Sequence, residues 1–260
     1  MRYFLKATLM LLLSISLLSC QKVEEEKNAI VESKISTSIS GISSLTLKAG
    51  GDIIISGDGK MDGVFISTPS GTISKEGDAL VISSKSEDIS AVIPGYIQKV
   101  SAESRSGNVD VREIKTDNLG IRLSGPGDLV LDQVDGSYIT LSTESGDMEI
   151  SNVDVDDLFF SSYSGNADVR SSSAKNLVVT SYSTKMDMEL DGLESVRVET
   201  DSEEVSIKTD KKGARVSFAG GSESYADIFG LTINENGEYE TGDGSIRLSF
   251  STNSGGLRIK

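Results

Sequence analysis

The sequence predicts an all-β protein whose main part, residues 40–260, is a single-domain parallel β-solenoid with coils of about 19 to 20 residues. The first observation is an internal repeat of that length. The second is composition: Val, Ile and Leu alternate with Ser, Thr and Gly, and the chain holds 26 Gly but only 3 Pro. Such a mixture is typical of short strands joined by many turns, and not of amphipathic helices.

Residues 1–19 have the features of an export signal. Arg2 and Lys6 give a short basic start, and an apolar run follows from Ala7 to Leu18. This run is too short, and too soon followed by polar sequence, to be a membrane-spanning helix. It therefore predicts a signal peptide.

Cys20 is the only cysteine of the chain and follows Leu17, Leu18 and Ser19. This ending resembles the bacterial lipobox, in which a small residue precedes an acylated cysteine. The resemblance implies cleavage after Ser19 and lipidation of Cys20 with a diacylglycerol and an N-acyl chain, which anchors the protein in a membrane. An ordinary secretory signal with an incidental cysteine is the alternative.

Residues 20–39 are expected to form the lipidated end and a charged tether, because the stretch after Cys20 is rich in Glu and Lys and has little to bury. Position 22 is Lys. In enteric bacteria an Asp there resembles a signal for retention in the inner membrane. The sequence therefore favours the cell envelope, at the outer membrane or the cell surface.

The repeat begins with corners of the form Ser-Gly-Asp/Asn, followed by an apolar-x-apolar strand. The second residue of each corner falls at 107, 127, 146, 165, 184 and 203. A second apolar pair follows 12 and 14 residues later, for example Ile139 and Leu141; in the last unit it slips by one residue, to Ala214 and Val216. No unit can bury its own apolar face, so we expect successive coils to stack with equivalent residues above one another.

An antiparallel β-sandwich is the alternative, because strands spaced at 8–12 residues would give a similar strand count. The residue-by-residue likeness of the corners favours the solenoid. Towards the C-terminus, residues 231–239 predict a hairpin about Asn236 and Gly237 that caps the stack. Residues 254–259 repeat the corner once more.

These corners, together with the closing residues 251–259, resemble the bacterial putative-adhesin domain of unknown function, which is related to head-domain autotransporter adhesin-like proteins. The resemblance covers roughly residues 40–260. It implies a β-solenoid-like fold and association with the cell envelope, and it brings no catalytic residues.

Composition excludes several kinds of chemistry. The chain has no His, so catalysis by Ser-His-Asp or Cys-His systems and His-ligated zinc are excluded. The formal net charge of −15 repels phosphate backbones, so nucleic acid is not an expected partner. With paired carboxylates as the one catalytic arrangement left open, we expect a non-enzymatic protein without a cofactor, with Ca²⁺ as the one candidate ion.

Stacking is expected to align acidic residues in two outward rows. Asn108, Asp128, Asp147 and Asn166 form one row, and Asp110, Glu149, Asp168 and Asp187 form the other, with Val130 interrupting it. Equivalent residues on neighbouring coils lie about 4.8 Å apart. No Arg or Lys row accompanies these acids.

Three interpretations of these rows are open. They form a solvated face that prevents lateral aggregation, a Ca²⁺ site in a calcium-stabilised structural module, or a carboxylate pair of a carbohydrate-active enzyme. The candidate Ca²⁺ ligands are Asp128, Asp147, Glu149, Asp168 and Asp187.

Aromatic and apolar residues also align outward. Tyr163 and Tyr182 are equivalent on successive coils, as are Phe159 and Val178. They predict either a contact surface for a protein or glycan partner, or stacking that stiffens the solenoid. The sequence as a whole predicts a non-enzymatic, lipid-anchored envelope protein with an adhesin-like binding or structural role.

Overall fold

The computed structural model describes residues 35–260, and within this range it contains strands and no helix. Cys20 and the signal peptide lie outside the described residues. In the part of the chain that is described, no helix is long and apolar enough to span a membrane. The strands are β1 (Ile35–Ser40), β2 (Ser44–Ala49), β3 (Ile53–Asp58), β4 (Gly63–Thr68), β5 (Thr72–Glu76), β6 (Ala79–Ser83), β7 (Ile89–Pro94), β8 (Lys99–Ser104), β9 (Val109–Pro126), β10 (Leu129–Ser145), β11 (Met148–Asp191), β12 (Ser195–Thr200), β13 (Glu204–Lys208), β14 (Ala214–Gly220), β15 (Tyr225–Ile228), β16 (Leu231–Ile233), β17 (Gly237–Thr241), β18 (Ile246–Thr252) and β19 (Gly256–Ile259).

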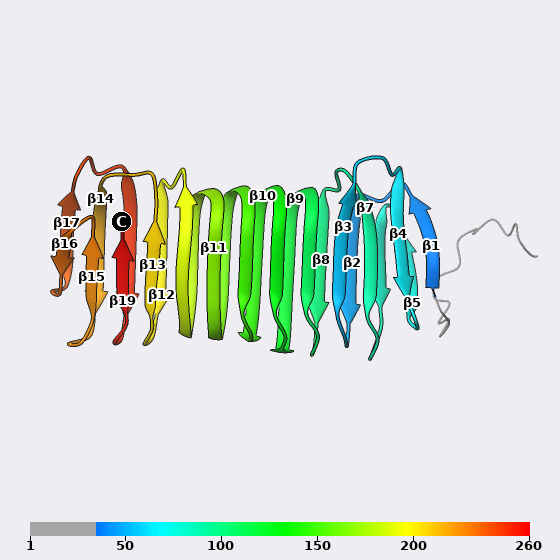
Figure 1. The fold of residues 1–260 in the computed structure, drawn as a ribbon, viewed down its shortest axis with the longest axis horizontal. Helices are drawn as coiled ribbons and strands as arrows, with labels where there is room; N and C mark the ends of the chain where they lie inside the picture. Colours follow the sequence, from blue (N-terminus) through cyan, green and yellow to red (C-terminus); the bar gives the residue numbers. More distant parts are fainter. Residues whose placement is uncertain (1–34) are drawn as a thin grey trace, which may run out of the picture. The chain divides into compact units, whose positions relative to one another are not determined.

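The central coils stack in parallel, as the repeat predicts (Figure 1). Leu129 of β10 pairs with Val109 of β9 on one side and with Met148 of β11 on the other. These three residues and Ala167 are all at most 2% exposed. The parallel solenoid is therefore confirmed, and the antiparallel sandwich is wrong for this part of the chain.

Each coil folds around one continuous core. The first strand of a coil and the second strand, some ten residues later, both turn alternate apolar residues inward, such as Leu131 and Ile139. Between them lies the third inward residue, represented by Ile114, Val134 and Val153. The residue before each of these has a positive φ, between 54° and 58°, although none is glycine. This left-handed residue turns the chain from one side of the coil to the next.

In the four corners at 107, 127, 146 and 165, the glycine of one coil stands directly above the glycine of the next. A Cβ built on Gly127 would lie 2.3 Å from the carbonyl oxygen of Gly107, and one on Gly146 would lie 2.0 Å from that of Gly127. Gly165 continues the row at 2.2 Å from Gly146. Only a residue without a side chain permits this approach, and at Gly146 the φ of 132° adds a second requirement for glycine.

At the ends of the stack, the order in space departs from the order in the chain (Figure 1). The coil formed by β2 and β3 lies between the coil of β6 and β7 and the coil of β8 and the start of β9. At the other end, β18 and β19 lie between the coil of β12 and β13 and the coil of β14 and β15. The expectation that Ala214 and Val216 follow directly on the coil of Val196 is wrong, because the C-terminal strands are inserted there.

Antiparallel strands cover both ends. β5 folds back on β6, and β4 pairs with β7 and carries β1 on its other edge. At the far end β16 folds back on β15, and β17 pairs with β14. The predicted hairpin about Asn236 and Gly237 is therefore wrong: the tight turn is at Phe229 and Gly230, both with positive φ. Because β1 begins at Ile35, the folded part starts before residue 40, within the range assigned to the tether.

Candidate binding surface

Two outward surfaces of the solenoid carry most of the described residues that the sequence singled out. We call the outward residues of the first strand of each coil the charged face; it includes Asp110, Glu149, Asp168 and Asp187. We call those of the second strand the aromatic face; it includes Tyr138, Phe159 and Val178. The parallel register places Val130 between Asp110 and Glu149, as the spacing predicts.

Three acids of the charged face, Asp110, Asp168 and Asp187, are paired with basic residues, whereas Glu149 has no ion pair among residues 35–260. The Asp110 carboxylate accepts a hydrogen bond from Nε of Arg112 at 2.6 Å, which raises the pKa of the Arg112 guanidinium. Arg170 binds both oxygens of Asp168. No purely basic row accompanies the acids, because the outward row of Arg112 also holds Asp132 and Ser151. The individual ion pairs were not expected, although a basic residue two positions along a strand lies on the same outward face.

The neighbouring row of Asp and Asn residues forms a hydrogen-bonded ladder along the stack. A side-chain oxygen of Asp128 accepts the backbone N–H of Asp147 at 3.0 Å, and an oxygen of Asp147 accepts the backbone N–H of Asn166 at 2.9 Å. Asn108 accepts from Asp128 in the same way, at 2.8 Å. These oxygens therefore link adjacent coils, and Asn serves as well as Asp because only an acceptor oxygen is needed.

The proposed Ca²⁺ ligands do not converge on one point. Asp128 and Asp147 lie in this ladder, whereas Glu149, Asp168 and Asp187 lie on the charged face, and Lys185 is 3.5 Å from Asp187. Within residues 35–260 no group of three or more His, Cys, Asp or Glu side chains is placed to hold a metal ion. The geometry thus shows oxygens engaged with backbone N–H groups and cations of the protein.

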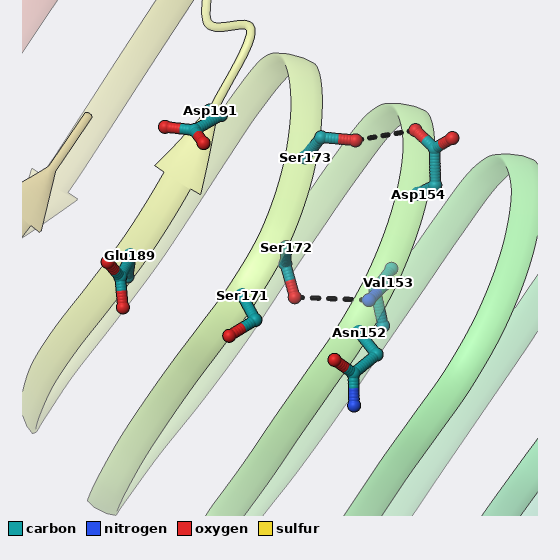
Figure 2. Close-up of a pocket in the computed structure, with 8 residues that line it drawn as sticks. All are labelled: Asn152, Val153, Asp154, Ser171, Ser172, Ser173, Glu189 and Asp191. Carbon is teal, nitrogen blue, oxygen red and sulfur yellow. Dashed lines mark hydrogen bonds between the residues drawn. The ribbon is translucent and has the colours of Figure 1, made fainter. Parts of the chain in front are cut away.

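A shallow groove of about 590 Å³ lies where the chain turns between the two strands of a coil. Figure 2 shows that its wall is formed by short polar side chains: Ser173 Oγ donates to Asp154 at 2.5 Å, and Ser172 Oγ accepts the Val153 N–H at 3.1 Å. Glu189 and Asp191 lie on the next coil and form no hydrogen bond with the other residues drawn (Figure 2). The two hydrogen bonds of Ser172 and Ser173 connect adjacent coils.

The aromatic face holds a cluster that the sequence reasoning found only in part. Phe159 and Val178 lie there as predicted, and the ring of Tyr138 packs against Phe159 with centroids 4.7 Å apart and planes tilted by 35°. Tyr138 is 39% exposed. It was missed, although it stands one coil before Asp157 at an outward position that the repeat itself identifies.

Tyr163 and Tyr182 lie at the end of the second strand, beyond Phe159 and Val178. Their rings are stacked, with centroids 4.8 Å apart and planes 2° from parallel, and they are 62% and 50% exposed. Each ring covers one face of the other, so the pair offers the ring edges, the hydroxyl groups and the outer face of each ring to a partner. The predicted alignment of the two residues is thus present.

The stacked parallel coils and the single core define a β-solenoid protein. The chain belongs to the Toastrack DUF4097 family, whose model matches residues 22–260. The resemblance to a putative-adhesin domain of unknown function is therefore confirmed at the level of the family. A comparison with curated proteins gives no match.

Solved structures agree with the fold. A putative adhesin from Bacteroides fragilis is 12% identical, with a TM-score of 0.53 over 89% of this chain and 99% of that chain. A putative adhesin from Parabacteroides merdae is 7% identical, with a TM-score of 0.47 over 88% of this chain and 95% of that one. At this identity the Bacteroides fragilis structure supports the fold alone. The Parabacteroides merdae structure, with its lower TM-score, carries no argument.

Proposed function

We propose that this chain is a non-enzymatic, lipid-anchored protein of the cell envelope that binds a protein or glycan partner through its aromatic face. The observation that carries the proposal is the contrast between the two faces. On the charged face Asp110, Asp168 and Asp187 are each within salt-bridge distance of a basic residue. On the aromatic face Tyr138 and Phe159 are partly exposed and have no polar row covering them.

A rigid support favours binding by such a surface. Each residue of the aromatic face belongs to a strand that is hydrogen-bonded on both sides. Docking of a partner therefore costs little conformational entropy of the backbone or of the side chains. Aromatic residues contribute large contact areas at protein interfaces. The Bacteroides fragilis protein of similar fold is named a putative adhesin, which agrees with a binding role.

The charged face does not favour an enzyme. Glycoside cleavage needs one carboxyl group that can donate a proton beside a second carboxylate. Asp168 accepts hydrogen bonds from Nε and Nη2 of Arg170, and the equivalent acid of the next coil, Asp187, lies beside Lys185. These ion pairs engage carboxylate oxygens of Asp168 and Asp187 that such a mechanism would use, which leaves Glu149 as the acid of the row without an ion pair among residues 35–260.

The proposed anchor is the lipid on Cys20, after removal of residues 1–19, with the following residues as a tether and the outer membrane or cell surface as the destination. Replacing Cys20 by Ala is expected to release the protein from the membrane fraction and to abolish acyl labelling. Retention of the unlabelled variant in membranes would contradict the anchor.

The binding surface is tested by attaching the full-length protein to beads and measuring their retention on arrays of glycans and matrix proteins. The double variant Tyr138→Ser/Phe159→Ser is expected to weaken retention by about tenfold or more, the range of an interface hot spot. Val130→Ser, an outward substitution on the charged face, is the matched control and should leave retention unchanged. Equal loss in both variants, or no retention of the wild type, would refute the proposed surface.

A further inference from the structure

A depression of about 340 Å³ lies on the aromatic face beside Tyr138. Outward residues of three consecutive coils surround it, and the buried side chains of Val100 and Leu119 lie beneath. The outward residues are Lys99, Ser101, Asn118, Gly120, Tyr138 and Thr140. We call this depression the Gly120 slot.

Gly120 creates the slot. It pairs with Ser101 on one side and with Thr140 on the other, and both of these neighbours carry outward side chains. A Cβ on Gly120 would meet no atom within 4 Å, and its φ is not in the left-handed region. Neither the backbone nor the packing therefore requires glycine here. A glycine inside a strand weakens the strand, and it often marks a place where a ligand approaches closely.

The two sides of the Tyr138 ring have different surroundings. On one side the ring packs against Phe159 of the next coil. On the other side, the neighbouring coil places Asn118 and Gly120 at the equivalent positions. Since Gly120 has no side chain, this side of the ring forms one wall of the slot, and hydroxyl and amide groups form the rim.

Lys99 is the one charged residue among those that line the slot, although the chain carries a net charge of −15. Lys99 lines the slot, and Arg122 projects from the same strand as Gly120, two residues further on. Among residues 35–260, neither side chain has an acidic group within salt-bridge distance, whereas Glu103 between them is paired with Lys48 at 3.6 Å. Two exposed cations without partners favour an anionic ligand.

We infer that the Gly120 slot binds one carboxylate-bearing pyranose unit of an acidic glycan. This inference rests on the proposed function and names the chemistry of its partner. The apolar C–H face of the sugar stacks on the Tyr138 ring, Asn118 and the hydroxyl groups of Ser101 and Thr140 bind the sugar hydroxyls, and Lys99 binds the carboxylate. The volume of the slot lies at the lower end of the roughly 300–1,000 Å³ of small-molecule sites, which suits one ring.

The test is an NMR titration of the full-length protein with free D-glucuronate, D-glucose, acetate and a short polyglutamate peptide. We expect a Kd on the order of 1 mM for glucuronate, as for a ligand of about a dozen heavy atoms. Glucose should bind at least about fivefold more weakly, because it lacks the charge-assisted contact with Lys99. Acetate should not bind measurably, because it lacks the ring.

Gly120→Val fills the slot without touching the core and is expected to abolish binding of glucuronate while the melting temperature stays the same or rises. Ser249→Val, on β18 in the same row of outward positions, is the matched control and should bind as the wild type does. Lys99→Gln should reduce the affinity for glucuronate to that for glucose, and it provides a second test that does not depend on position 120.

Unchanged glucuronate binding in Gly120→Val would overturn the inference, as would equal affinity for acetate or tighter binding of the peptide. Absence of glucuronate binding by the wild type would also overturn it. If retention on the arrays still depends on Tyr138 and Phe159 in that case, the proposed binding face stands and only the acidic sugar is wrong.

Discussion

The middle of the solenoid and its two ends use the same kinds of strand but connect them differently. From β9 to the end of β11 each coil stacks on the coil that precedes it in the chain. At the N-terminal end β2 and β3 are inserted between coils formed later in the sequence, and at the C-terminal end β18 and β19 are inserted in the same manner. Spacing therefore predicts neighbours only where the chain advances one coil at a time.

The inserted coils place the chain's first and last full coils inside the stack. The strand β18 has a parallel neighbour on each edge, so both of its edges are hydrogen-bonded, and its residues Leu248 and Phe250 are at most 3% exposed. The strands left outermost, such as β1 and β17, are short and antiparallel. Short strands therefore form the open edges of the stack. They prevent the parallel strands inside from pairing with strands of other molecules.

Deletion of residues 243–260 is expected to have the largest effect. It removes five large buried side chains, each of which contributes about 2–5 kcal/mol, and it leaves β12 and β14 without their shared neighbour. Residues 195–241 should unfold while the central coils remain folded, because each coil of a solenoid contacts only its neighbours. Hydrogen exchange and limited proteolysis measure this loss.

Deletion of residues 1–40 is the matching truncation at the N-terminal end of the stack. It removes β1, a strand with a single partner strand. It should leave the protection of the remaining coils unchanged. Persistent protection of β12 against hydrogen exchange in the C-terminal deletion would show that the inserted coil is dispensable. The different connection of the terminal coils would then make no contribution to stability.

Gly146→Ala is expected to destabilise the middle by about 3 kcal/mol, because it adds strain at a positive φ to a close contact between coils. For a chain of this size that corresponds to a fall in melting temperature of roughly 6–12 °C. Gly59→Ala, near the N-terminal end, meets no atom within 4 Å and has no positive φ, so it should change the melting temperature little or raise it. A similar fall in both variants would disprove the special role of the stacked corners.

Asp147→Ala should have the smallest effect, a loss of about 1–2 kcal/mol, because it removes the acceptor for two hydrogen bonds from Asn166. Asp147→Asn keeps an acceptor oxygen, as Asn108 and Asn166 do in the same ladder, and should remain within about 0.5 kcal/mol of the wild type. Denaturant unfolding measures both. Equal destabilisation by the two variants would mean that the charge of Asp147, and not its hydrogen bonds, stabilises the stack.

Much of the central fold could be predicted because each coil repeats its residue pattern. Val109, Leu129, Met148 and Ala167 are buried in register, as their spacing requires. The hairpin at residues 231–239 was misassigned because Asn-Gly is the usual turn of an isolated hairpin, whereas here Phe229 and Gly230 make the turn. Which strands pair at the ends depends on free edges that exist only after the stack has formed.

The sequence predicted where the candidate surfaces lie, but not which residues are paired within them. The rows of Phe159 and Val178 and of Tyr163 and Tyr182 follow from the repeat, and their placement agrees with it. The pairing of Asp168 with Arg170 was overlooked, although a spacing of two residues puts them on one face of a strand. The Gly120 slot could not be read from the repeat alone, because a glycine in a strand pattern does not tell whether its neighbours fill the space beside it.

By itself the sequence determined the solenoid, the inward residues and the outward rows, because a coil that cannot bury its own apolar face must repeat its pattern to stack. The predictions of a signal peptide and of lipidation at Cys20 also depend only on the first twenty residues. Only the tertiary structure decided the order of the terminal coils, the partners of the acids and the empty space over Gly120. Each of these depends on which strands of distant sequence become neighbours, and that is fixed by edge pairing and packing across the stack.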